Sequence, residues 1–358
     1  MLRYLQRLRG PASDRPRALD WSRANIARLS LALVAATYGS NYACVKLLDR
    51  WVGTAAEAAV LRFSVSAAAA LPTLAHFART HRQLVSLPVA RDGLAIGGLF
   101  GLGYMVQAVA LETSLASTQA FLLSLSVLVV PLLDRIVGRT PQPERVWLAA
   151  CMAVLGICCL EGGGLASATL SMGDVVGLLQ AFFFGAGYWV CERAIRRHRT
   201  PGSDGLALSV ALTAWNLLAV LALALAWLAL DRCCYPLPTG GVSTQGLGAL
   251  AVSMASSPLD HLPMIAAVLW TGLVTTAVCA FVEAAVLTQL SSSEAMVVFA
   301  TEPVWGAFLS WAMLGEDLGP ATLVGGLLMV AACVISGSED ADPRGAAVRA
   351  RKWFVKRK

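Results

Sequence analysis

The sequence alternates apolar stretches of membrane-spanning length with short polar loops. A helix needs about 20 predominantly apolar residues to cross the hydrocarbon core of a bilayer. Inside that core an open chain satisfies its own backbone N–H and C=O groups only as a helix. The sequence therefore predicts an all-α polytopic membrane protein with ten transmembrane helices, at about 26–47, 55–77, 93–111, 117–136, 146–160, 175–195, 206–230, 264–289, 295–314 and 320–336.

Composition agrees with this class and excludes others. Hydrophobic residues make up 57% of the chain and charged residues 14%, whereas a soluble domain carries about 25% charged residues. The ten spans and their loops use nearly all 358 residues, which leaves no room for a sizeable soluble domain. The net charge is +6, and the positive residues lie mostly in the predicted loops and tails. Because no basic patch is interleaved with aromatic residues, we expect no nucleic-acid partner.

The distribution of Lys and Arg predicts the orientation in the membrane. On this topology one side receives 24 of the 28 basic residues, and the opposite side receives Lys46, Arg50 and Arg232. Cytoplasmic loops carry the excess of Lys and Arg in membrane proteins. We therefore expect both termini on the cytoplasmic side of a plasma, inner or organellar membrane.

The segments outside the spans have distinct compositions. Residues 1–25 form a basic segment without the long apolar core of a secretory signal, and we expect a cytoplasmic tail, with a short organellar targeting segment as the alternative. Residues 231–263 are rich in Pro and Gly and are expected to form a long external loop. Residues 337–358 form a basic cytoplasmic tail, which is either solvated or lies on anionic lipid.

The last five spans echo the first five when the chain is shifted by 176 residues. Residues 26–160 and 175–336 are thus predicted to be two five-helix repeats. Because each has an odd number of spans, the two are inverted relative to each other. Inverted repeats place a substrate site near the midplane between the halves. Matching positions are Val106 and Val282, Gln107 and Glu283, Ala108 and Ala284, Leu111 and Leu287, and Ser117 and Ser293.

Polar side chains inside the spans are candidates for the substrate site. Each has a structural alternative, because such groups also hydrogen-bond neighbouring helices. Tyr38 and Asn41 share a helix face, and Gln107 and Glu283 occupy equivalent repeat positions that should converge on a cavity. The candidate substrate-binding residues are Tyr38, Asn41, Gln107, Trp270, Thr271, Thr275, Glu283 and Trp305.

Charged groups inside spans carry a second hypothesis. A charge at the bilayer centre costs about 2.5–3.5 kcal/mol on insertion scales. Glu302 is predicted to be a coupling carboxylate or a structural acceptor. Arg62 is predicted either to pair with Glu57 or another carboxylate, or to recognise an anionic group.

Three further residues near span ends have structural interpretations that compete with a place in the cavity. Lys46 is expected to extend to the external surface, or else to meet an anionic cargo. Tyr188 and Glu192 share a face near a membrane edge, which favours an interfacial belt over a cavity.

Catalytic and metal-binding motifs are missing from the sequence. It contains no HExxH, GxSxG or Walker A motif and no CxxC pair. The histidines fall at span ends or in loops, at His76, His81, His198 and His261. We therefore expect no enzyme activity, no cofactor and no metal.

Three ordered segments resemble the EamA-type family of the drug/metabolite transporter superfamily. They are YGSNYACVK at 38–46 followed by Arg62-Phe63, GYMVQAVALETSLASTQAFLLSLSVLVVP at 103–131, and SEAMVVFATEPVWGAFLSWAMLG at 293–315 with Glu316 after it. The resemblance covers about residues 28–336. It implies ten helices, a central cavity open to alternate sides, and transport of small metabolites without ATP hydrolysis. The chain departs from the pattern at Ser126-Val127, which stands where the second half has Glu302-Pro303, and in its long 231–263 loop.

These observations favour a secondary transporter that exports or facilitates amino-acid-like or other small organic solutes. The alternative within the superfamily is an antiporter of phosphorylated sugars or nucleotide sugars, which would need a cluster of Lys and Arg in the cavity. A non-transporting membrane scaffold ranks below both. The expected partners are a small-molecule substrate and the lipid bilayer. A homodimer is left open, because Gly97, Gly98 and Gly101 could pack helices within or between chains.

Overall fold

The structure is a computed structural model that describes residues 18–52, 54–138, 144–160, 171–198, 205–234, 256–257, 259–286, 298–299 and 301–337. Across these ranges the regular structure is helical, without any strand. The predicted all-α class is therefore confirmed. The elements are α2 (Ala18–Val52), α3 (Ala55–Thr80), the short 3₁₀ helix η1 (Arg82–Val85), α4 (Leu87–Thr113), α5 (Ala116–Ser124), α6 (Ser126–Ile136), α7 (Glu144–Leu160), α8 (Met172–His198), α9 (Gly205–Cys234), α11 (Leu262–Leu269), the π-helix η2 (Trp270–Val278), α12 (Cys279–Val286), α14 (Glu302–Leu314) and α15 (Pro320–Gly337).

Six helical stretches in the described ranges are long and apolar enough to cross a membrane. They are Ala55–Thr80, Leu87–Thr113, Ala116–Ile136, Met172–His198, Gly205–Cys233 and Leu262–Val286. Shorter apolar helices cover Trp147–Gly156 and Pro320–Ala332, and α2 and α14 lie at the two remaining predicted spans. Each predicted span thus coincides with a helix in whole or in part. The count of ten transmembrane helices in two repeats stays a prediction.

Three of the predicted spans are not single regular α-helices. The fourth divides at Leu125, whose N–H bonds the carbonyl of Leu122 three residues back at 3.2 Å. The eighth contains the nine-residue π-helix η2. In the ninth, α14 begins only at Glu302, because Pro303 has no N–H to continue a preceding turn. These irregularities were not predicted, since hydropathy records apolar length but not hydrogen-bond register.

The segments between spans differ from the predicted ranges at their edges. Helix α2 begins at Ala18, so part of the predicted segment 1–25 is helical. Helix α9 continues to Cys234 and α11 begins at Leu262, which narrows the predicted 231–263 loop at both ends. Residues 235–255 of that loop and the tail 338–358 lie outside the described residues.

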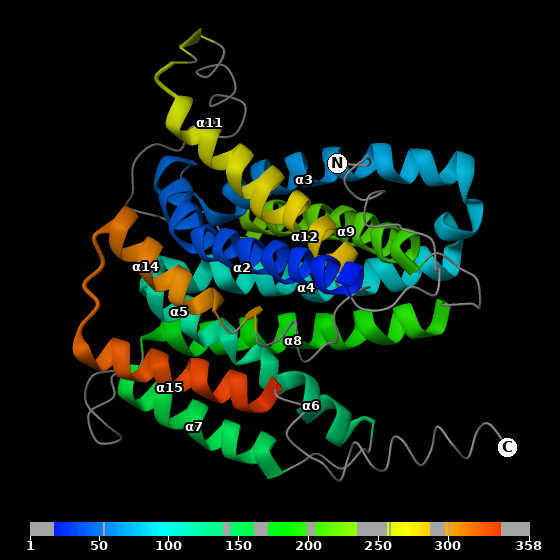
Figure 1. Ribbon diagram of the computed structural model, residues 1–358. Helices are drawn as coiled ribbons and strands as arrows, with labels where there is room; N and C mark the ends of the chain where they lie inside the picture. Colours follow the sequence, from blue (N-terminus) through cyan, green and yellow to red (C-terminus); the bar gives the residue numbers. More distant parts are fainter. Residues whose placement is uncertain are drawn as a thin grey trace, which may run out of the picture.

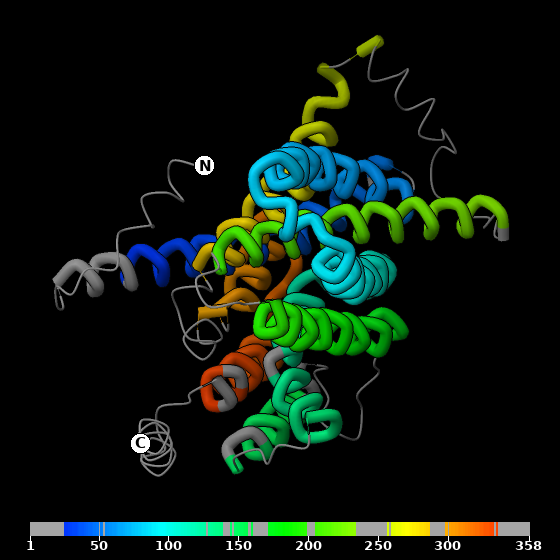
Figure 2. The backbone as a smooth tube through the Cα atoms, turned by 90° about the vertical axis from the view of Figure 1, so that its right-hand side faces the viewer, coloured from blue at the N-terminus to red at the C-terminus, as the bar shows by residue number. Residues whose placement is uncertain are grey.

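The helices form one bundle in which distant parts of the chain lie side by side (Figures 1 and 2). Helix α4 packs between α8 and α9, and α3 packs against both α9 and η2. Helix α14 lies against α2 and α5, while α6 lies against α8. Helices α7 and α15 pair at one edge of the bundle (Figure 1). In the view of Figure 2, which is turned by 90° from that of Figure 1, several helices run nearly end-on.

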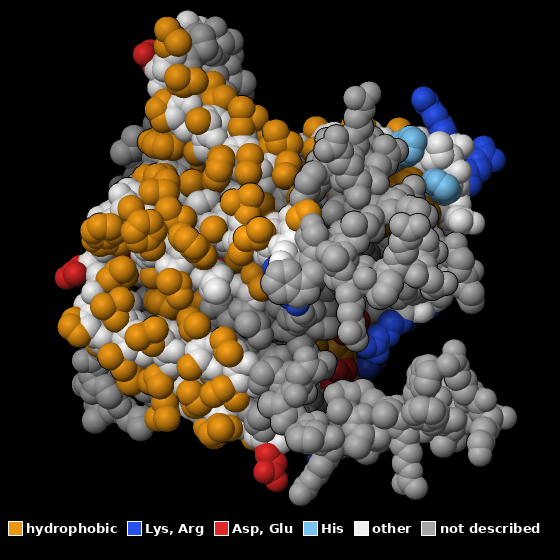
Figure 3. Space-filling view, viewed as in Figure 1, with side chains coloured by type: hydrophobic (Ala, Val, Ile, Leu, Met, Phe, Trp, Pro, Cys, Tyr) orange, Lys and Arg blue, Asp and Glu red, His pale blue; other side chains and the backbone are white. Residues whose placement is uncertain are grey.

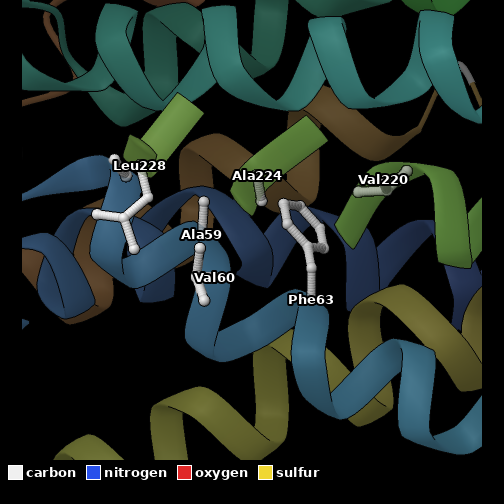
Figure 4. Close-up of a cluster of buried hydrophobic side chains, with 7 residues drawn as sticks. Ala59, Val60, Phe63, Val220, Ala224 and Leu228 are labelled. Atoms are coloured by element: carbon white, nitrogen blue, oxygen red, sulfur yellow. The ribbon is translucent and has the colours of Figure 1, made fainter. Parts of the chain in front are cut away.

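The contact between α3 and α9 is a dry apolar core (Figure 4). Small side chains such as Ala59 and Ala224 let the two helices approach, and Phe63 fills the space between them. Phe63 is 1% exposed and Ala224 is fully buried. This packing relies on small residues and close fit, as expected where lipid supplies no hydrophobic drive between helices.

The outer surface of the bundle is strongly apolar. Hydrophobic side chains cover much of the face in Figure 3, and the Lys and Arg visible there gather at the right-hand end. Leu29 and Leu33 of α2 are 71% and 69% exposed, and Leu327 of α15 is 66% exposed. Soluble monomers rarely expose apolar patches wider than a few hundred Å², so this surface is suited to lipid.

Adjacent glycines in α4 have different surroundings. A Cβ on Gly97 would overlap the carbonyl oxygen of Asn216 and lie 2.6 Å from the Cβ of Ala219, both in α9. A Cβ on Gly98 would meet nothing within 4 Å. Gly97 therefore packs α4 against α9 within the chain, whereas Gly98 faces open space. The structure describes one chain, so the homodimer is not tested.

We expect Gly97→Ala to destabilise the protein and Gly98→Ala to leave it unchanged or slightly more stable. Overpacking costs typically about 1–3 kcal/mol, whereas Gly to Ala in an open helical position gains about 0.4–1 kcal/mol through the unfolded chain. Thermal unfolding of both variants in the same detergent measures the difference. Equal midpoints for the two variants would contradict the close approach of α4 and α9.

Candidate functional site

A central cavity lies between the two halves of the chain. Its lining comes from α2, α4, α5 and α6 in the first half and from α8, α9, η2, α12 and α14 in the second. About 150 Å³ of it can hold the centre of a water molecule, whereas one buried water needs about 10–15 Å³. The space therefore suits a small molecule. Among the predicted site residues, it is lined by Tyr38, Asn41, Gln107, Thr275, Glu283 and Glu302.

Glu283 of α12 is the first of two carboxylates in this cavity. Its side chain is 7% exposed. The hydroxyl of Tyr38 in α2 donates to its Oε2 at 2.9 Å. A phenol from another helix thus holds the carboxylate in place at the cavity wall, where Tyr188 of α8 is also a lining residue.

Glu302 is the second carboxylate and is the first residue of α14. The hydroxyl of Tyr42 in α2 donates to its Oε1 at 3.1 Å, and among the described residues Tyr42 is its only donor. The N-terminus of a helix carries a partial positive charge, which stabilises a negative side chain there. The break before Pro303 therefore places Glu302 at the helix end that best tolerates its charge.

Asn41 connects three helices through hydrogen bonds at the cavity wall. Its amide nitrogen donates to Gln107 Oε1 of α4 at 3.4 Å, and the hydroxyl of Thr275 in η2 lies 3.0 Å from its Oδ1. That hydroxyl is also 2.9 Å from the carbonyl of Thr271. These residues therefore do both things that the sequence allowed: they line the cavity, and they hydrogen-bond neighbouring helices.

The π-helix η2 places its threonines differently from a regular helix. The hydroxyl of Thr276 donates to the carbonyl of Thr271 five residues back at 2.6 Å. The hydroxyl of Ser66 in α3 donates to the Gly272 carbonyl at 2.7 Å, which fixes η2 against α3. Short π segments often occur at functional sites. Here the segment turns Thr275 and Thr276 toward the cavity.

Three of the candidate residues lie away from the cavity. Thr271 is fully buried and bonds the carbonyl of Ala267 at 2.7 Å. Trp270 is 41% exposed and donates from Nε1 to Ser40 at 2.8 Å. Trp305 is 42% exposed on the outer side of α14. Helical spacing alone put these residues near Thr275, but the wider turn of η2 and the outward face of α14 separate them from the lining.

Arg62 is buried and does not pair with Glu57, the partner that the sequence named. Glu57 accepts instead from Arg232 at 3.0 Å, because Arg232 belongs to the extended end of α9. The Arg62 side chain lies 4.4 Å from the ring centroid of Phe63 and 5.2 Å from that of Tyr104. Its Nε and Nη2 have no hydrogen-bond partner among the described residues. Arg62 therefore sits behind Tyr104, outside the cavity lining.

Several cavity residues were not among the predicted site residues. Tyr42, Tyr104, Tyr188 and Asn216 are examples that line the cavity. The interpretation of Tyr188 as part of an interfacial belt is wrong, although Glu192 does face outward and pairs with Arg196. Helical spacing held a usable signal, since Tyr42 follows Tyr38 by four residues and Tyr104 precedes Gln107 by three. Asn216 is a polar side chain inside an apolar span, which was itself a signal.

Beyond one end of the cavity, Lys46 and Glu316 form a buried ion pair. Their charged atoms are 3.3 Å apart, and the side chains are 18% and 6% exposed. Lys46 also donates to the carbonyl of Ser114 at 2.7 Å. The Glu316 carboxylate accepts from the backbone N–H groups of Ala116 and Ser117, the first residues of α5. Lys46 therefore neither extends to the surface nor lines the cavity.

A second buried network joins α5 to the start of α8. The hydroxyl of Ser114 donates to Asp174 Oδ1 at 2.5 Å, and Gln119 donates to the Ser114 oxygen at 2.8 Å. Gln180 donates to Gln119 Oε1 at 2.7 Å. Asp174 and Ser171 also bond each other's backbone N–H groups, as in a capping box. Together with the ion pair, this network fixes the same end of the bundle.

The described residues contain no cluster of three or more His, Cys, Asp or Glu side chains that could hold a metal ion. The cavity carboxylates Glu283 and Glu302 are each bonded by phenols. The arrangement can bind and release a small solute by hydrogen bonds and charge.

Comparisons with known proteins agree with the resemblance noted in the sequence. Residues 171–338 match the model of the EamA-like transporter family, in agreement with the predicted resemblance over that part of the chain. An uncharacterized transporter from Archaeoglobus fulgidus is 26% identical over 310 residues, which cover 86% of this chain and 85% of the relative. A solved crystal structure is similar with a TM-score of 0.52 over 88% of this chain and 96% of its own, at 18% identity. That likeness concerns the fold alone.

We expect Glu316→Gln to destabilise the protein near neutral pH. Burial raises the pKa of Glu316, but the N–H groups of Ser117 and Ala116, the Ser117 hydroxyl and Lys46 outweigh it and lower the pKa below its usual range. A hydrogen bond to a charged group contributes about 1.5–3 kcal/mol. Because the folded pKa is depressed, this stability is complete above the unfolded pKa of about 4.3 and is lost as pH falls through the folded value.

Thermal unfolding in detergent from pH 7 downward measures this effect. The midpoint difference between wild type and Glu316→Gln should shrink as the solution becomes more acidic than about pH 4. Asp317→Asn removes the adjacent exposed carboxylate and is the matched control. A difference that stays constant with pH, or an equal effect in the control, would contradict the role of Glu316.

Proposed function

We propose that this chain, which belongs over residues 171–338 to the EamA-like transporter family, is a secondary transporter that moves a small organic solute without ATP hydrolysis. Membership of that family and the apolar helices make it a multi-pass membrane transporter of the drug/metabolite superfamily. The proposal adds alternating access to a single central site and amino-acid-like or other small organic solutes as cargo. One observation carries it, namely the central cavity that helices from both halves line and that contains Glu283 and Glu302.

The packing of the helices supports two inverted repeats. A two-fold relation would exchange each of the first five predicted spans with the span five places later. It would turn the contact of α4 with α8 into a contact of η2 and α12 with α2. Both contacts occur. The contact of α14 with α2 likewise becomes that of α5 and α6 with α8, which is also present. The pairs α3–α9 and α7–α15 map onto themselves. A two-fold relation between the halves accounts for all of these contacts.

Local features repeat in the same way. The fourth span breaks at Leu125 and the ninth at Thr301, positions that are separated by the repeat shift of 176. Gly39 of α2 approaches Trp305 and Gly306 of α14, and Gly185 of α8 approaches Ser126 and Val129 of α6. Broken helices that meet at the midplane are a recurring way to build a site in secondary transporters.

The position of the cavity supports one open and one closed end. The lining reaches Ile195 near the end of α8 and Ser209 near the start of α9, but stops at Val220 well before α9 ends. The first end carries the basic loops and is the proposed cytoplasmic side, with both termini. Beyond the other end lies the pair Lys46–Glu316. Alternating access would then require this end to open while the first closes.

The composition of the lining weighs against the alternative cargo. Phosphorylated sugars and nucleotide sugars call for Lys or Arg at the site, and no Lys, Arg or His is among the described residues that line the cavity. Arg62 lies behind Tyr104. An amine-bearing or neutral solute fits these groups better than a phosphate does.

We expect purified protein in proteoliposomes to exchange labelled solute from a mixed pool of amino acids, amines, sugars and nucleotide sugars. Counterflow, with and without an imposed pH gradient, measures the exchange. Glu302→Gln should reduce it at least about tenfold, because the variant leaves a buried phenol and helix end without the charge that they hold. Glu192→Gln, an exposed carboxylate on α8 outside the cavity, is the control and should retain exchange.

Two outcomes would contradict these expectations, the first for the carrier itself and the second for the charge of Glu302. Folded protein that exchanges no member of the pool would remove the support for a carrier of these solutes. Exchange that is equal in wild type and Glu302→Gln would show that the Glu302 carboxylate is structural, and would assign the cavity a role independent of its charge.

A further inference from the structure

We propose that the cavity selects a solute with a positively charged amine or ammonium group beside an apolar or aromatic part. This inference deepens the proposed function by naming the charge class of the cargo. It can be tested by binding alone, so it does not depend on transport being observed. The charges, hydrogen-bonding groups and aromatic rings of the described lining residues support this cargo class.

The cavity contains two carboxylates and lacks a compensating cation among its described lining residues. Glu283 and Glu302 both line it, and no Lys, Arg or His does. Neither carboxylate forms an ion pair with any described residue, although Lys46, Arg232 and Arg197 all pair with carboxylates elsewhere. A buried carboxylate is costly without a positive partner. A cationic solute would supply that partner.

The hydrogen-bonding groups around the carboxylates are arranged to hold negative charge and to leave acceptors free. The phenol protons of Tyr38 and Tyr42 point to Glu283 and Glu302 respectively. A carboxylate has about four lone-pair sites, so a single phenol donor leaves room for a further donor. Asn216 adds an oxygen, Oδ1, that is buried without a donor among the described residues. An ammonium group offers up to three N–H donors to such acceptors.

Aromatic rings form the neighbouring wall of the cavity. Tyr104 lies edge-on to Phe184 with ring centroids 4.9 Å apart, and Phe100 lies edge-on to Tyr188 at 5.2 Å. Phe299 stacks with Tyr38 at 6.3 Å. All six of these rings line the cavity. Aromatic faces attract cations electrostatically, and more strongly where water is excluded. The same rings give an apolar surface for the uncharged part of a solute.

The Arg62 guanidinium explains why an anionic group is disfavoured. This buried cation packs against the rings of Phe63 and Tyr104 and is not among the residues that line the cavity. A carboxylate or phosphate in the cavity would therefore face Glu283 and Glu302 without a cation beside it. Two like charges in one site repel, and this repulsion is a means of rejecting anionic solutes.

The test compares three soluble probes of similar size that differ in charge. They are 2-phenylethylammonium, 2-phenylethanol and 3-phenylpropanoate. Binding to the purified full-length protein in neutral detergent is measured by isothermal titration calorimetry near neutral pH. We expect the ammonium compound to bind at least about tenfold more tightly than the alcohol, and the propanoate more weakly still. This comparison uses wild type only, so it holds even if a variant fails to fold.

Variants then identify the groups that recognise the charge. We expect Glu302→Gln or Glu283→Gln to weaken binding of the ammonium compound at least about tenfold while leaving the alcohol within about twofold. Glu192→Gln is the matched control and should bind all three probes as wild type does. A thermal midpoint close to that of wild type shows that each variant is folded.

The proposal is overturned if the alcohol or the propanoate binds as tightly as the ammonium compound, if none of the probes binds wild type, or if both folded glutamate variants keep wild-type affinity for the ammonium compound. Counterflow separates this failure from failure of the proposed function. Exchange of neutral or anionic solutes alone would keep the carrier and overturn the charge class. Tight binding of the ammonium compound without exchange of any solute would keep the charge class and overturn the carrier.

Discussion

Backbone N–H and C=O groups in the bilayer core have no water to bond, so a chain that crosses it must satisfy them within its own helices. An interruption is tolerated only where protein or a polar cavity replaces the missing partners. The irregular points at Ser126, Glu302 and η2 obey this constraint, since each adjoins the central cavity. The same constraint explains why the polar side chains gather there. The substrate site needs exposed polar groups, and an interrupted helix supplies them. The interruptions and the site therefore occur at the same place.

Small residues make this arrangement possible at close range. Gly39 lets α2 approach the start of α14, and this proximity brings Tyr42 within hydrogen-bonding distance of Glu302. Gly272 lets η2 approach α3, where Ser66 bonds its carbonyl. Because lipid supplies little hydrophobic drive between helices, close packing and hydrogen bonds between helices must hold the bundle together. The geometry of the carboxylates therefore depends on glycines that make no contact with a solute.

Hydropathy and helical spacing predicted the helical class and most helix positions, because both depend on local composition. They also placed Gln107 and Glu283 on the cavity through the repeat alone. They failed where position depends on register or on a distant partner. Trp270 and Thr271 were misplaced because a π turn changes the face of a helix. The pairing of Glu57 with Arg232 was missed because it joins α3 to a helix end beyond the predicted span. Tyr188 was assigned to the membrane edge because its neighbours in the cavity, such as Phe100, are remote in sequence.

Under the proposed two-fold relation, the two halves would share their backbone plan but not their charge. In each equivalent pair the first half carries a neutral residue, Gln107 or Ser126, and the second half a carboxylate, Glu283 or Glu302. The two ends of the bundle differ as well. The pair Lys46–Glu316 is nearly buried, whereas Arg193 and Asp134 at the other end are 43% and 40% exposed and 3.8 Å apart. Exposed pairs contribute little because water screens them. Asp92 and His198, also at that end, are 14% and 16% exposed and 2.8 Å apart. Each end of the bundle therefore has a largely buried polar contact. In the proposed alternating-access mechanism, binding of cargo between the halves would have to offset the loss of such a contact before the site could face the other side.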